Sequence, residues 1–543
     1  MSQETVTFKS KPDSTNQSTK NTITIGKDIK LTLADVKYVA QNNAPVMLST
    51  ESTASMQQSK DFLQRCIDEY MPVYGVNTNF GDQVGFIDNN LKNKAEPPCY
   101  EEIGMRQENL IRSMACSTGN ILPLEMVRAA MLLRAHCLSQ GYSGVSTEVV
   151  NSLINFLNKR VTPIVRQYGS IGASGDLIPL ASIAACLIGE SADVHYFGSV
   201  TKTTVAMYET GIKKLELELR DGLALANGTS FMTGVASLAV YNLKRLFRQM
   251  LSAIAMSLES MLVIGSGYHP LVHQLKNQSG EIIVNNFLKE FWCDSNLVSS
   301  LETLRNAAIT NNNTTTPVRS VQDYYSLRSV AQGFGPFHEN LENAVVWIEN
   351  EMNSVNDNPI IDAANREIHH GANFMGYYVT NSCDILKMDI SQASTWLHAL
   401  LANMLHPRKS QQLPANLVQK PEKNNGFRSL QILAASLTVQ NRKLAQSHQA
   451  YTFPTEGDNQ DVYSLGTHAA QDLQDAINNL EKLTAILFLA AAQALEFRGI
   501  ENASSKAQTI YKIIRGKSRT LTDCRPMSED MHIITKLLAQ EEI

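Results

Sequence analysis

Residues 169–181 read Gly-Ser-Ile-Gly-Ala-Ser-Gly-Asp-Leu-Ile-Pro-Leu-Ala, a glycine-rich turn followed by an apolar run with Pro179 near its start. Because proline is favoured in the first turn of a helix, the run predicts a helix directly after the turn. The turn does not match a phosphate-binding loop, since it lacks a Gly-Lys-Ser/Thr ending and its glycines are spaced GxxGxxG rather than GxGxxG. It does not match a hydrolase nucleophile elbow either, because Asp176 stands where a second glycine would have to follow Ser174.

The tripeptide Ala173-Ser174-Gly175 has the composition that a backbone cyclisation requires. For the Gly175 nitrogen to attack the Ala173 carbonyl carbon, the flanking side chains must be minimal, and glycine lacks the Cβ that would block the approach. Loss of one water closes an imidazolone ring, and loss of the Ser174 hydroxyl leaves an exocyclic methylidene, an electrophile that no ordinary side chain supplies. Taken alone, such a tripeptide is more often a plain tight turn, so the rest of the chain must decide.

The composition is that of a globular chain without nucleic-acid or membrane partners. The 543 residues carry 47 Lys and Arg against 52 Asp and Glu, with no basic stripe interleaved with aromatic residues. The longest apolar runs are about a dozen residues, short of the roughly 18 that span a bilayer. The eight cysteines have no CxxC spacing, which argues against a disulfide framework and favours the cytoplasm. Residues 1–22 are polar and predict a disordered tail rather than a signal peptide.

Long stretches without proline predict a mainly α fold. Residues 231–264, 379–405 and about 467–497 each suit one helix of about 25 to 35 residues, far above the usual length of about 11 to 12. Helices of this length favour a bundle, and we expect an oligomeric one. From Pro123 to Gly141, apolar residues recur at helical spacing and predict an amphipathic helix.

Strand signals are confined to the short runs 22–25 and 46–48. We therefore expect a mixed α/β part over residues 23–220, which carries the tripeptide. Residues 221–543 are expected to form the long-helix bundle and the C-terminal helices.

Seven blocks, in order along the chain, resemble the signatures of the aromatic amino acid lyases that use 4-methylidene-imidazol-5-one (MIO). This family comprises histidine, tyrosine and phenylalanine ammonia-lyases and related aminomutases, and the chain most resembles the bacterial type of phenylalanine ammonia-lyase. The blocks are 74–81 (YGVNTNFG), 169–181, 222–229 (GLALANGT), 322–328 (QDYYSLR), 356–359 (NDNP), 370–374 (HGANF) and 459–466 (NQDVYSLG). The resemblance runs from about residue 23 to the end. It implies a homotetramer whose active sites are shared between chains.

The resemblance also implies the catalytic roles. Ala173, Ser174 and Gly175 would form MIO autocatalytically, with no external cofactor, and its methylidene would capture the substrate amine. Tyr74 would be the general base, for which a phenol that ordinarily titrates near pH 10 needs a lowered pKa. Tyr325 would lie against the cyclised tripeptide and donate a hydrogen bond.

Further positions would bind the substrate. Arg328 would hold the carboxylate, because a guanidinium presents two parallel donors to two oxygens. Glu456 would accept the amine proton. The remaining pocket positions implied by the motifs are Asn227, Gln322, Asn356, Phe374 and Gln460, for each of which a purely structural role in a turn or core stays open. His369 and His370 do not suggest a metal, since adjacent histidines rarely converge on one ion.

The ring-selectivity pair of the family corresponds to Ser113-Met114, which matches none of the pairs typical of its phenylalanine, tyrosine or histidine enzymes. Ser113 offers the hydroxyl that a buried tyrosine ring would need, and Met114 suits a flexible apolar wall. Gln460 stands where histidases place a Glu, which weakens the imidazole alternative. The order of expectation is phenylalanine, then tyrosine, then histidine. An aminomutase would use the same catalytic residues, so lyase and aminomutase both stay open.

Overall fold

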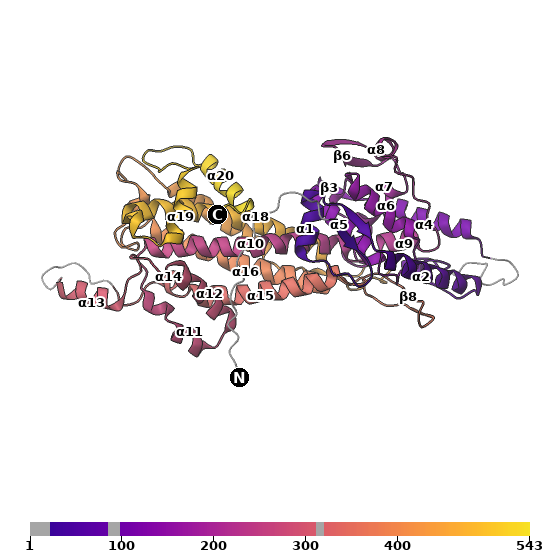
Figure 1. Cartoon of the computed structure of the whole chain (residues 1–543), viewed down its shortest axis with the longest axis horizontal. Coiled ribbons are helices and arrows are strands. Elements are labelled where there is room, and N and C mark those ends of the chain that lie inside the picture. The colour runs from indigo at the N-terminus through magenta and orange to yellow at the C-terminus, as the bar shows by residue number, and fades with distance from the viewer. Residues whose placement is uncertain (1–21, 85–97, 311–319) are drawn as a thin grey trace.

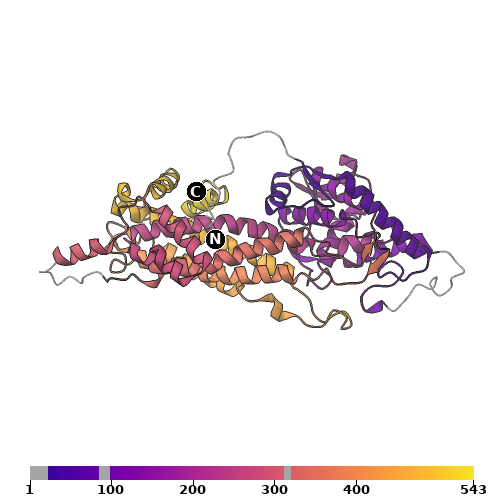
Figure 2. The same ribbon diagram turned by 60° about the horizontal axis from the view of Figure 1, so that its bottom comes forward.

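The computed structural model describes residues 22–84, 98–310 and 320–543, so the tail expected at residues 1–22 lies almost wholly outside the described residues. The molecule is elongated, and its longest helices run along its long axis (Figure 1). The N-terminal elements gather at one end of this axis, and the C-terminal helices lie toward the other (Figures 1 and 2). The mainly α fold expected from the sequence is confirmed.

Long helices form the bundle. They are α10 (Ser230–Ser260), α15 (Val330–Met352), α16 (Tyr377–Met404), α17 (Arg428–Leu444) and α18 (Gly466–Arg498). Three of them, α10, α16 and α18, confirm the long helices predicted from the sequence. Helix α18 packs against both α10 and α16, while α16 also contacts α15 and α17. Because α18 is covered from two sides, its apolar stretch from Leu483 to Leu495 is buried on every face.

Shorter helices form most of the N-terminal part. They are α1 (Leu33–Asn42), α2 (Thr50–Asp68), α4 (Tyr100–Met114), α5 (Leu124–Leu138), α6 (Thr147–Asn158), α7 (Leu177–Leu187), α8 (Thr203–Thr210) and α9 (Asp221–Ala226). Helix α5 begins after Pro123 as predicted, but the amphipathic pattern was wrong, since every residue from Met126 to Leu138 is buried. The buried Arg128 is tolerated because its guanidinium donates to the carbonyl oxygens of Val39, Ala40 and Leu157.

The strands are short and serve mainly to hold loops. They are β1 (Ile23–Ile25), β2 (Val46–Leu48), β3 (Thr118–Ile121), β4 (Val161–Pro163), β5 (Arg166–Tyr168), β6 (Asp193–Tyr196), β7 (Ser199–Lys202), β8 (Ile360–Asp362) and β9 (Glu367–His369). The predicted pair β1 and β2 is confirmed and runs parallel. Antiparallel pairing joins β3 to β5, β4 to β6 to β7, and β8 to β9.

Small helices complete the chain around the bundle. They are η1 (Gly81–Gln83), η2 (Gly265–Tyr268), α11 (Pro270–Lys276), α12 (Ser279–Phe291), α13 (Leu301–Thr310), α14 (Tyr325–Arg328), η3 (Ala415–Leu417), η4 (His448–Tyr451), η5 (Ile500–Asn502), α19 (Ser505–Arg515) and α20 (Ser528–Ala539). One continuous apolar core extends from Ile25 to Leu538 and crosses residue 220, so the two-part division stays a prediction. Within the described part of the chain, every helix is too short or too polar to cross a membrane.

Candidate active site

The glycine-rich turn lies between β5 and α7, and two of its glycines have a positive φ. Gly172 has φ +73° and Gly175 has φ +66°, a region that side chains with a Cβ rarely adopt. A Cβ atom at Gly175 would lie 2.1 Å from the carbonyl oxygen of Gly228, and one at Gly172 would lie 2.3 Å from Ser464 Oγ. Neighbouring atoms therefore lie so close to the turn that only glycine fits at both positions.

Hydrogen bonds hold the unmodified tripeptide at its central residue. The Ser174 carbonyl oxygen accepts from Asn227 Nδ2 at 3.1 Å and from the Gly228 amide at 3.3 Å. Asn227 Nδ2 also lies 2.6 Å from Ser174 Oγ. Within the described residues, neither the Gly175 amide nor the Ala173 carbonyl has a hydrogen-bond partner. The two groups that cyclisation must join are thus left free, and the turn fits the formation of MIO.

Asp176, which sequence reasoning did not assign to the site, fixes the turn to the bundle. Its buried carboxylate accepts from Ser170 Oγ at 2.7 Å, from Thr467 Oγ1 at 2.5 Å and from the Met232 amide at 2.7 Å. Burial raises the pKa of Asp176 to about 6, although these donors act against the shift. The sequence signal that could have identified Asp176 was an acidic residue directly before an apolar helix.

Asn227, just after α9, is held from both sides. Its Oδ1 accepts from the Asn358 amide at 2.7 Å, and its carbonyl oxygen accepts from the buried guanidinium of Arg134 at 2.8 Å. Asn356 is also buried here, and its Oδ1 accepts from the Thr229 amide at 3.2 Å. The structure therefore places Asn356 behind the Asn227 turn, where it supports the backbone.

Tyr74 lies on a loop that contacts α9. Its hydroxyl oxygen accepts from the Gly81 amide at 3.0 Å, and its own amide donates to His370 Nε2 at 3.2 Å. Burial raises the pKa of Tyr74 above its ordinary value, and the negative charge of Glu456 adds to the shift, with the Gly81 hydrogen bond opposing it. The shift is opposite to the one a phenolic base requires, so this chain alone does not activate Tyr74.

Gln107 of α4 joins the Tyr74 loop to α9 and was missed from the sequence. Its Nε2 donates to the Gly75 carbonyl oxygen at 2.7 Å, and its Oε1 accepts from the Leu223 amide at 2.8 Å. The available signal was its spacing, because Ile103, Gln107 and Leu110 fall on one buried face of α4. A fully buried amide on an apolar face needs partners, and here they are the Tyr74 loop and helix α9.

Glu456 and Gln460 lie in a tight turn beside the Tyr74 loop. The backbone of Thr455 pairs with that of Gln460 in both directions, at 3.1 and 3.2 Å. A Cβ atom at Gly81 would lie 2.1 Å from Glu456 Oε1, so the carboxylate rests directly on the loop. Burial and the nearby charge of Asp82 raise the pKa of Glu456.

The same segment then reaches the tripeptide turn. The Leu465 amide donates to the Ile171 carbonyl oxygen at 3.0 Å, and Ser464 Oγ donates to that of Gly172 at 3.2 Å. Two residues after the half-buried Phe374, a Cβ atom at Gly376 would lie 3.4 Å from Ser464 Oγ, but the described contacts do not join the Phe374 side chain to this segment. Contacts therefore form a closed ring from the tripeptide through residues 456–465, the Tyr74 loop, Gln107 and α9 back to Ser174.

Ser113 and Met114 end helix α4. The exposed Ser113 hydroxyl donates to the Leu110 carbonyl oxygen at 2.9 Å, and the half-buried Met114 packs against the main core. Neither makes a described contact with the tripeptide.

Gln322, Tyr325 and Arg328 lie at the other end of the bundle. Helix α14, which holds Tyr325 and Arg328 and follows Gln322 by three residues, is fixed to the far part of α16, where Trp396 Nε1 donates to the Ser326 carbonyl oxygen at 2.8 Å. The near end of α16 meets the tripeptide segment, where Thr380 Oγ1 donates to the Ser464 carbonyl oxygen at 2.7 Å. At 1.5 Å per helical residue, the two places are about 25 Å apart. Figure 1 likewise shows α14 and α7 in opposite halves of the molecule.

Arg328 stacks on the exposed ring of Tyr325. The guanidinium carbon of Arg328 lies 4.7 Å from the centroid of the Tyr325 ring, which is 73% exposed. Gln322 is exposed as well. A single chain therefore brings together Tyr74, the tripeptide, Asn227, Glu456 and Gln460, but not these three residues.

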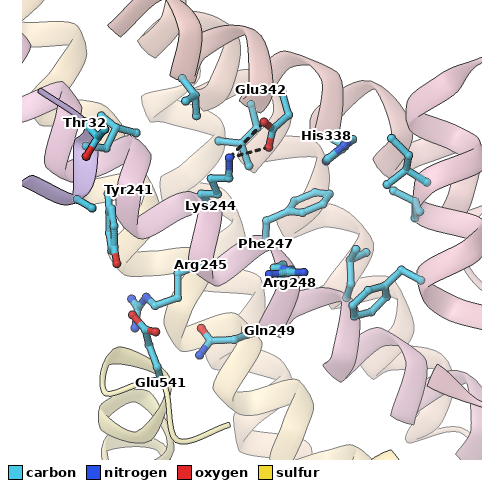
Figure 3. A pocket seen from close by; sticks show the side chains of 18 of the residues that line it. Thr32, Tyr241, Lys244, Arg245, Phe247, Arg248, Gln249, His338, Glu342 and Glu541 are labelled. Carbon is cyan, nitrogen blue, oxygen red and sulfur yellow. Dashed lines mark hydrogen bonds and ion pairs between the residues drawn. The ribbon is translucent and has the colours of Figure 1, made fainter. Parts of the chain in front are cut away.

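A separate cavity of about 980 Å³ lies between α1, α10, α12 and α15 (Figure 3). Figure 3 shows Arg245, Arg248 and Gln249 of α10 along one wall and His338 on another. Lys244 pairs across it with Glu342 at 3.1 Å. None of the predicted site residues lines this cavity, so it is distinct from the tripeptide region.

His370 Nε2 accepts from the Tyr74 amide, and its neighbour His369 lies 3.4 Å from Glu367. Across residues 22–84, 98–310 and 320–543, no group of three or more His, Cys, Asp or Glu side chains is arranged to hold a metal.

Comparison with known proteins agrees with the motifs. The family described as aromatic amino acid lyase matches residues 31–516. Tyrosine 2,3-aminomutase of Myxococcus fulvus is 34% identical over 513 residues, covering 94% of this chain and 95% of that protein. Histidine ammonia-lyase 2 of Fusobacterium nucleatum is 33% identical over 488 residues, covering 90% of each. The structure of phenylalanine aminomutase from Pantoea agglomerans matches with a TM-score of 0.89 at 28% identity, covering 95% of this chain and 99% of that one. The chain belongs to the aromatic amino acid lyase family.

Proposed function

We propose that this protein is an ammonia-lyase that converts an aromatic L-amino acid, phenylalanine first and tyrosine next, to the trans-arylacrylate and ammonium. The observation that carries the proposal is the closed ring of contacts that brings Tyr74, Asn227 and Glu456 around the Ala173-Ser174-Gly175 turn. The reaction removes a proton from the β-carbon and expels the amine, and both steps need an electrophile because neither group leaves readily.

The tripeptide is suited to supply that electrophile. Cyclisation forms a bond between the Gly175 nitrogen and the Ala173 carbonyl carbon and releases two waters, one of which takes the Ser174 hydroxyl. MIO provides the electrophilic carbon toward which the substrate amine is directed. Asn227 Nδ2, already donating to the Ser174 carbonyl oxygen, stabilises negative charge that develops on this oxygen.

Two side chains handle protons. Tyr74 takes the β-proton at its phenolic oxygen, and further cationic groups must lower its pKa in the complete site, because burial raises it in the single chain. Glu456 receives the amine proton, and its raised pKa favours this role. Gln460 and Phe374 complete the wall near the substrate.

The missing part of the site supports a homotetramer. Arg328, Tyr325 and Gln322 lie about 25 Å or more from the tripeptide of their own chain along α16, so another copy must bring them to it. Arg328 of that copy would bind the substrate carboxylate and add the positive charge that Tyr74 lacks. Its guanidinium lies against the exposed Tyr325 ring, where a substrate carboxylate could pair with it. A cytoplasmic enzyme accords with the scattered, unpaired cysteines.

The ring-selectivity pair suits an apolar ring and also admits tyrosine, so it leaves the order phenylalanine, then tyrosine as a proposal. The Ser113 hydroxyl already donates to the Leu110 carbonyl oxygen, so it can only accept from a substrate hydroxyl. Met114 contributes an apolar surface. Histidine ranks third because Gln460 carries no charge to pair with an imidazolium.

The second candidate is a 2,3-aminomutase, which would return the amine to the β-carbon. It is favoured by the similarity to tyrosine 2,3-aminomutase over nearly the whole chain. The test is incubation with L-phenylalanine, L-tyrosine and L-histidine separately, followed by chromatography with mass detection of all products. An arylacrylate with equal ammonia supports the lyase, and a β-amino acid of unchanged mass supports the aminomutase. No turnover of any of the three would refute the proposed substrate range.

A further inference from the structure

A cluster of charged side chains lies where the segment carrying Glu456 and Gln460 leaves the bundle. The segment runs from the end of α17 to the start of α18, and its helix η4 begins at His448. Its far end is fixed by Ser464 and Leu465 to the tripeptide turn. The near end must be fixed as well, because a turn anchored at one end could not hold Glu456 on Gly81.

Asp384 and Lys387 of α16 hydrogen-bond to the backbone of this near end. Asp384 Oδ2 accepts from the His448 amide at 2.9 Å and from Ser447 Oγ at 2.8 Å. The fully buried Lys387 donates to the Gln446 carbonyl oxygen at 3.0 Å and lies 2.9 Å from Asp384 Oδ1. Three consecutive residues of the segment are thus bound by one buried ion pair, whose charges depend on each other and on contacts with the segment for compensation.

The His448 ring connects this ion pair to α18. Lys387 Nζ lies 2.7 Å from His448 Nδ1, and because an ammonium group only donates, Nδ1 accepts in this contact. Nε2 on the opposite side of the ring lies 3.2 Å from Asp472 Oδ2. Asp384 Oδ1 also lies 3.3 Å from Nδ1. The imidazole therefore bridges α16 and α18 at the point where the segment departs.

The cluster also reaches the tripeptide turn. The ring of His468 in α18 stacks on His448 with centroids 6.3 Å apart and on Tyr168 of β5 with centroids 6.5 Å apart. His468 is also hydrogen-bonded to the backbone of Ser170 in the turn. The facing charged and titratable groups are Asp384 and Lys387 from α16 and His468 and Asp472 from α18.

We propose that His448 is a positioning residue, held by Asp384, Lys387 and Asp472, that fixes the segment 445–465 and thereby places Glu456 and Gln460 at the substrate. The inference rests on the proposed function for the roles of Glu456 and Gln460. The fixing of the segment itself is a separate property that can be measured without turnover.

The test compares His448→Gln with the wild-type full-length protein by hydrogen–deuterium exchange. The matched control is His398→Gln, a half-buried histidine of α16 that makes none of the contacts of the cluster. Exchange across 445–465 should rise at least about tenfold in His448→Gln, the loss of about 1.4 kcal/mol of local protection, while other segments and the control stay unchanged. If His448→Gln fails to fold, Asp472→Asn at the exposed edge of the cluster replaces it. This variant should also raise exchange across 445–465, by a smaller factor.

Kinetics provide the second measurement. His448→Gln should raise KM for the amino acid several-fold more than it lowers kcat, and it should leave the two-water mass loss of the tripeptide intact. Unchanged exchange across 445–465, or an equal rise in every segment, would overturn the inference. If wild type turns over no amino acid while exchange still rises locally in the variant, the proposed function fails but the positioning role of His448 stands.

Discussion

Replacing Gly175 with alanine tests whether close backbone approach governs the tripeptide. Gly175 has φ +66°, which costs an L-residue roughly 1–2 kcal/mol. In addition, the new Cβ would lie 2.1 Å from the Gly228 carbonyl oxygen, well inside the 3.4 Å at which ordinary contacts begin. Overpacking of this kind typically costs a further 1–3 kcal/mol. The turn should therefore lose about 2–5 kcal/mol in total or shift away from Asn227.

The matched control is Gly211→Ala. Gly211 has φ +67° and nothing within 4 Å of an added Cβ, so this variant carries the conformational cost alone. Intact mass of the purified, denatured chains should show loss of two waters in wild type and Gly211→Ala but not in Gly175→Ala. In thermal unfolding, the melting temperature should be highest for wild type, lower for Gly211→Ala and lowest for Gly175→Ala. A Gly175→Ala protein that loses two waters and melts with the control would refute the reasoning.

Four further results are expected. Ser174→Ala should retain the fold by circular dichroism but lose activity by orders of magnitude, and full activity would exclude the electrophile. Burial raises the pKa of Tyr74 in the single chain, and the assembled site is proposed to lower it, so the phenolate-dependent rise of the wild-type rate should level off below about pH 10, whereas Tyr74→Phe should show no such rise in its pH profile. Burial alone would raise the pKa of Asp384, but hydrogen bonds from His448 and Lys387 lower it to about 2, so it contributes about 2 kcal/mol above pH 4 that is lost as pH falls toward 2. Asp384→Asn should remove this acid-dependent part in urea unfolding at several pH values. Mixing inactive Ser174→Ala and Arg328→Ala subunits during refolding should restore part of the activity, and no recovery would contradict shared sites.

Much of the helical framework followed from the sequence. The long helices α10, α16 and α18 were predictable because proline-free runs of this length have few alternatives. Helix α15 was not predicted, since Pro336 and two glycines lie inside it, and tertiary packing against α12 and α16 overrides their local preference. The all-round burial of α5 was also missed, because helical spacing reveals one apolar face and not what covers the other.

Motif resemblance supplied the candidate site residues, but it did not predict how they are arranged in space. Nothing in the sequence order places Glu456 on Gly81, or separates Arg328 from Ser174 by the length of α16. Gln107 and Arg134 were missed because their value lies in long-range hydrogen bonds to backbone, which no local pattern encodes. Asn356 was expected at the pocket wall, yet its side chain contacts the Thr229 amide, Arg134 and Ser354 behind the Asn227 turn.

The distance between α14 and the tripeptide turn bears on how the protein responds to dilution and to inherited change. When a catalytic group and its binding group reside on different copies, specific activity follows the association equilibrium, so it falls when the subunit concentration drops below the dissociation constant. A defect at Arg328 then impairs the centres of neighbouring copies and leaves the defective copy's own tripeptide functional. In a cell that makes two versions of the chain, the damage is distributed over the mixed assemblies instead of staying with the altered subunit.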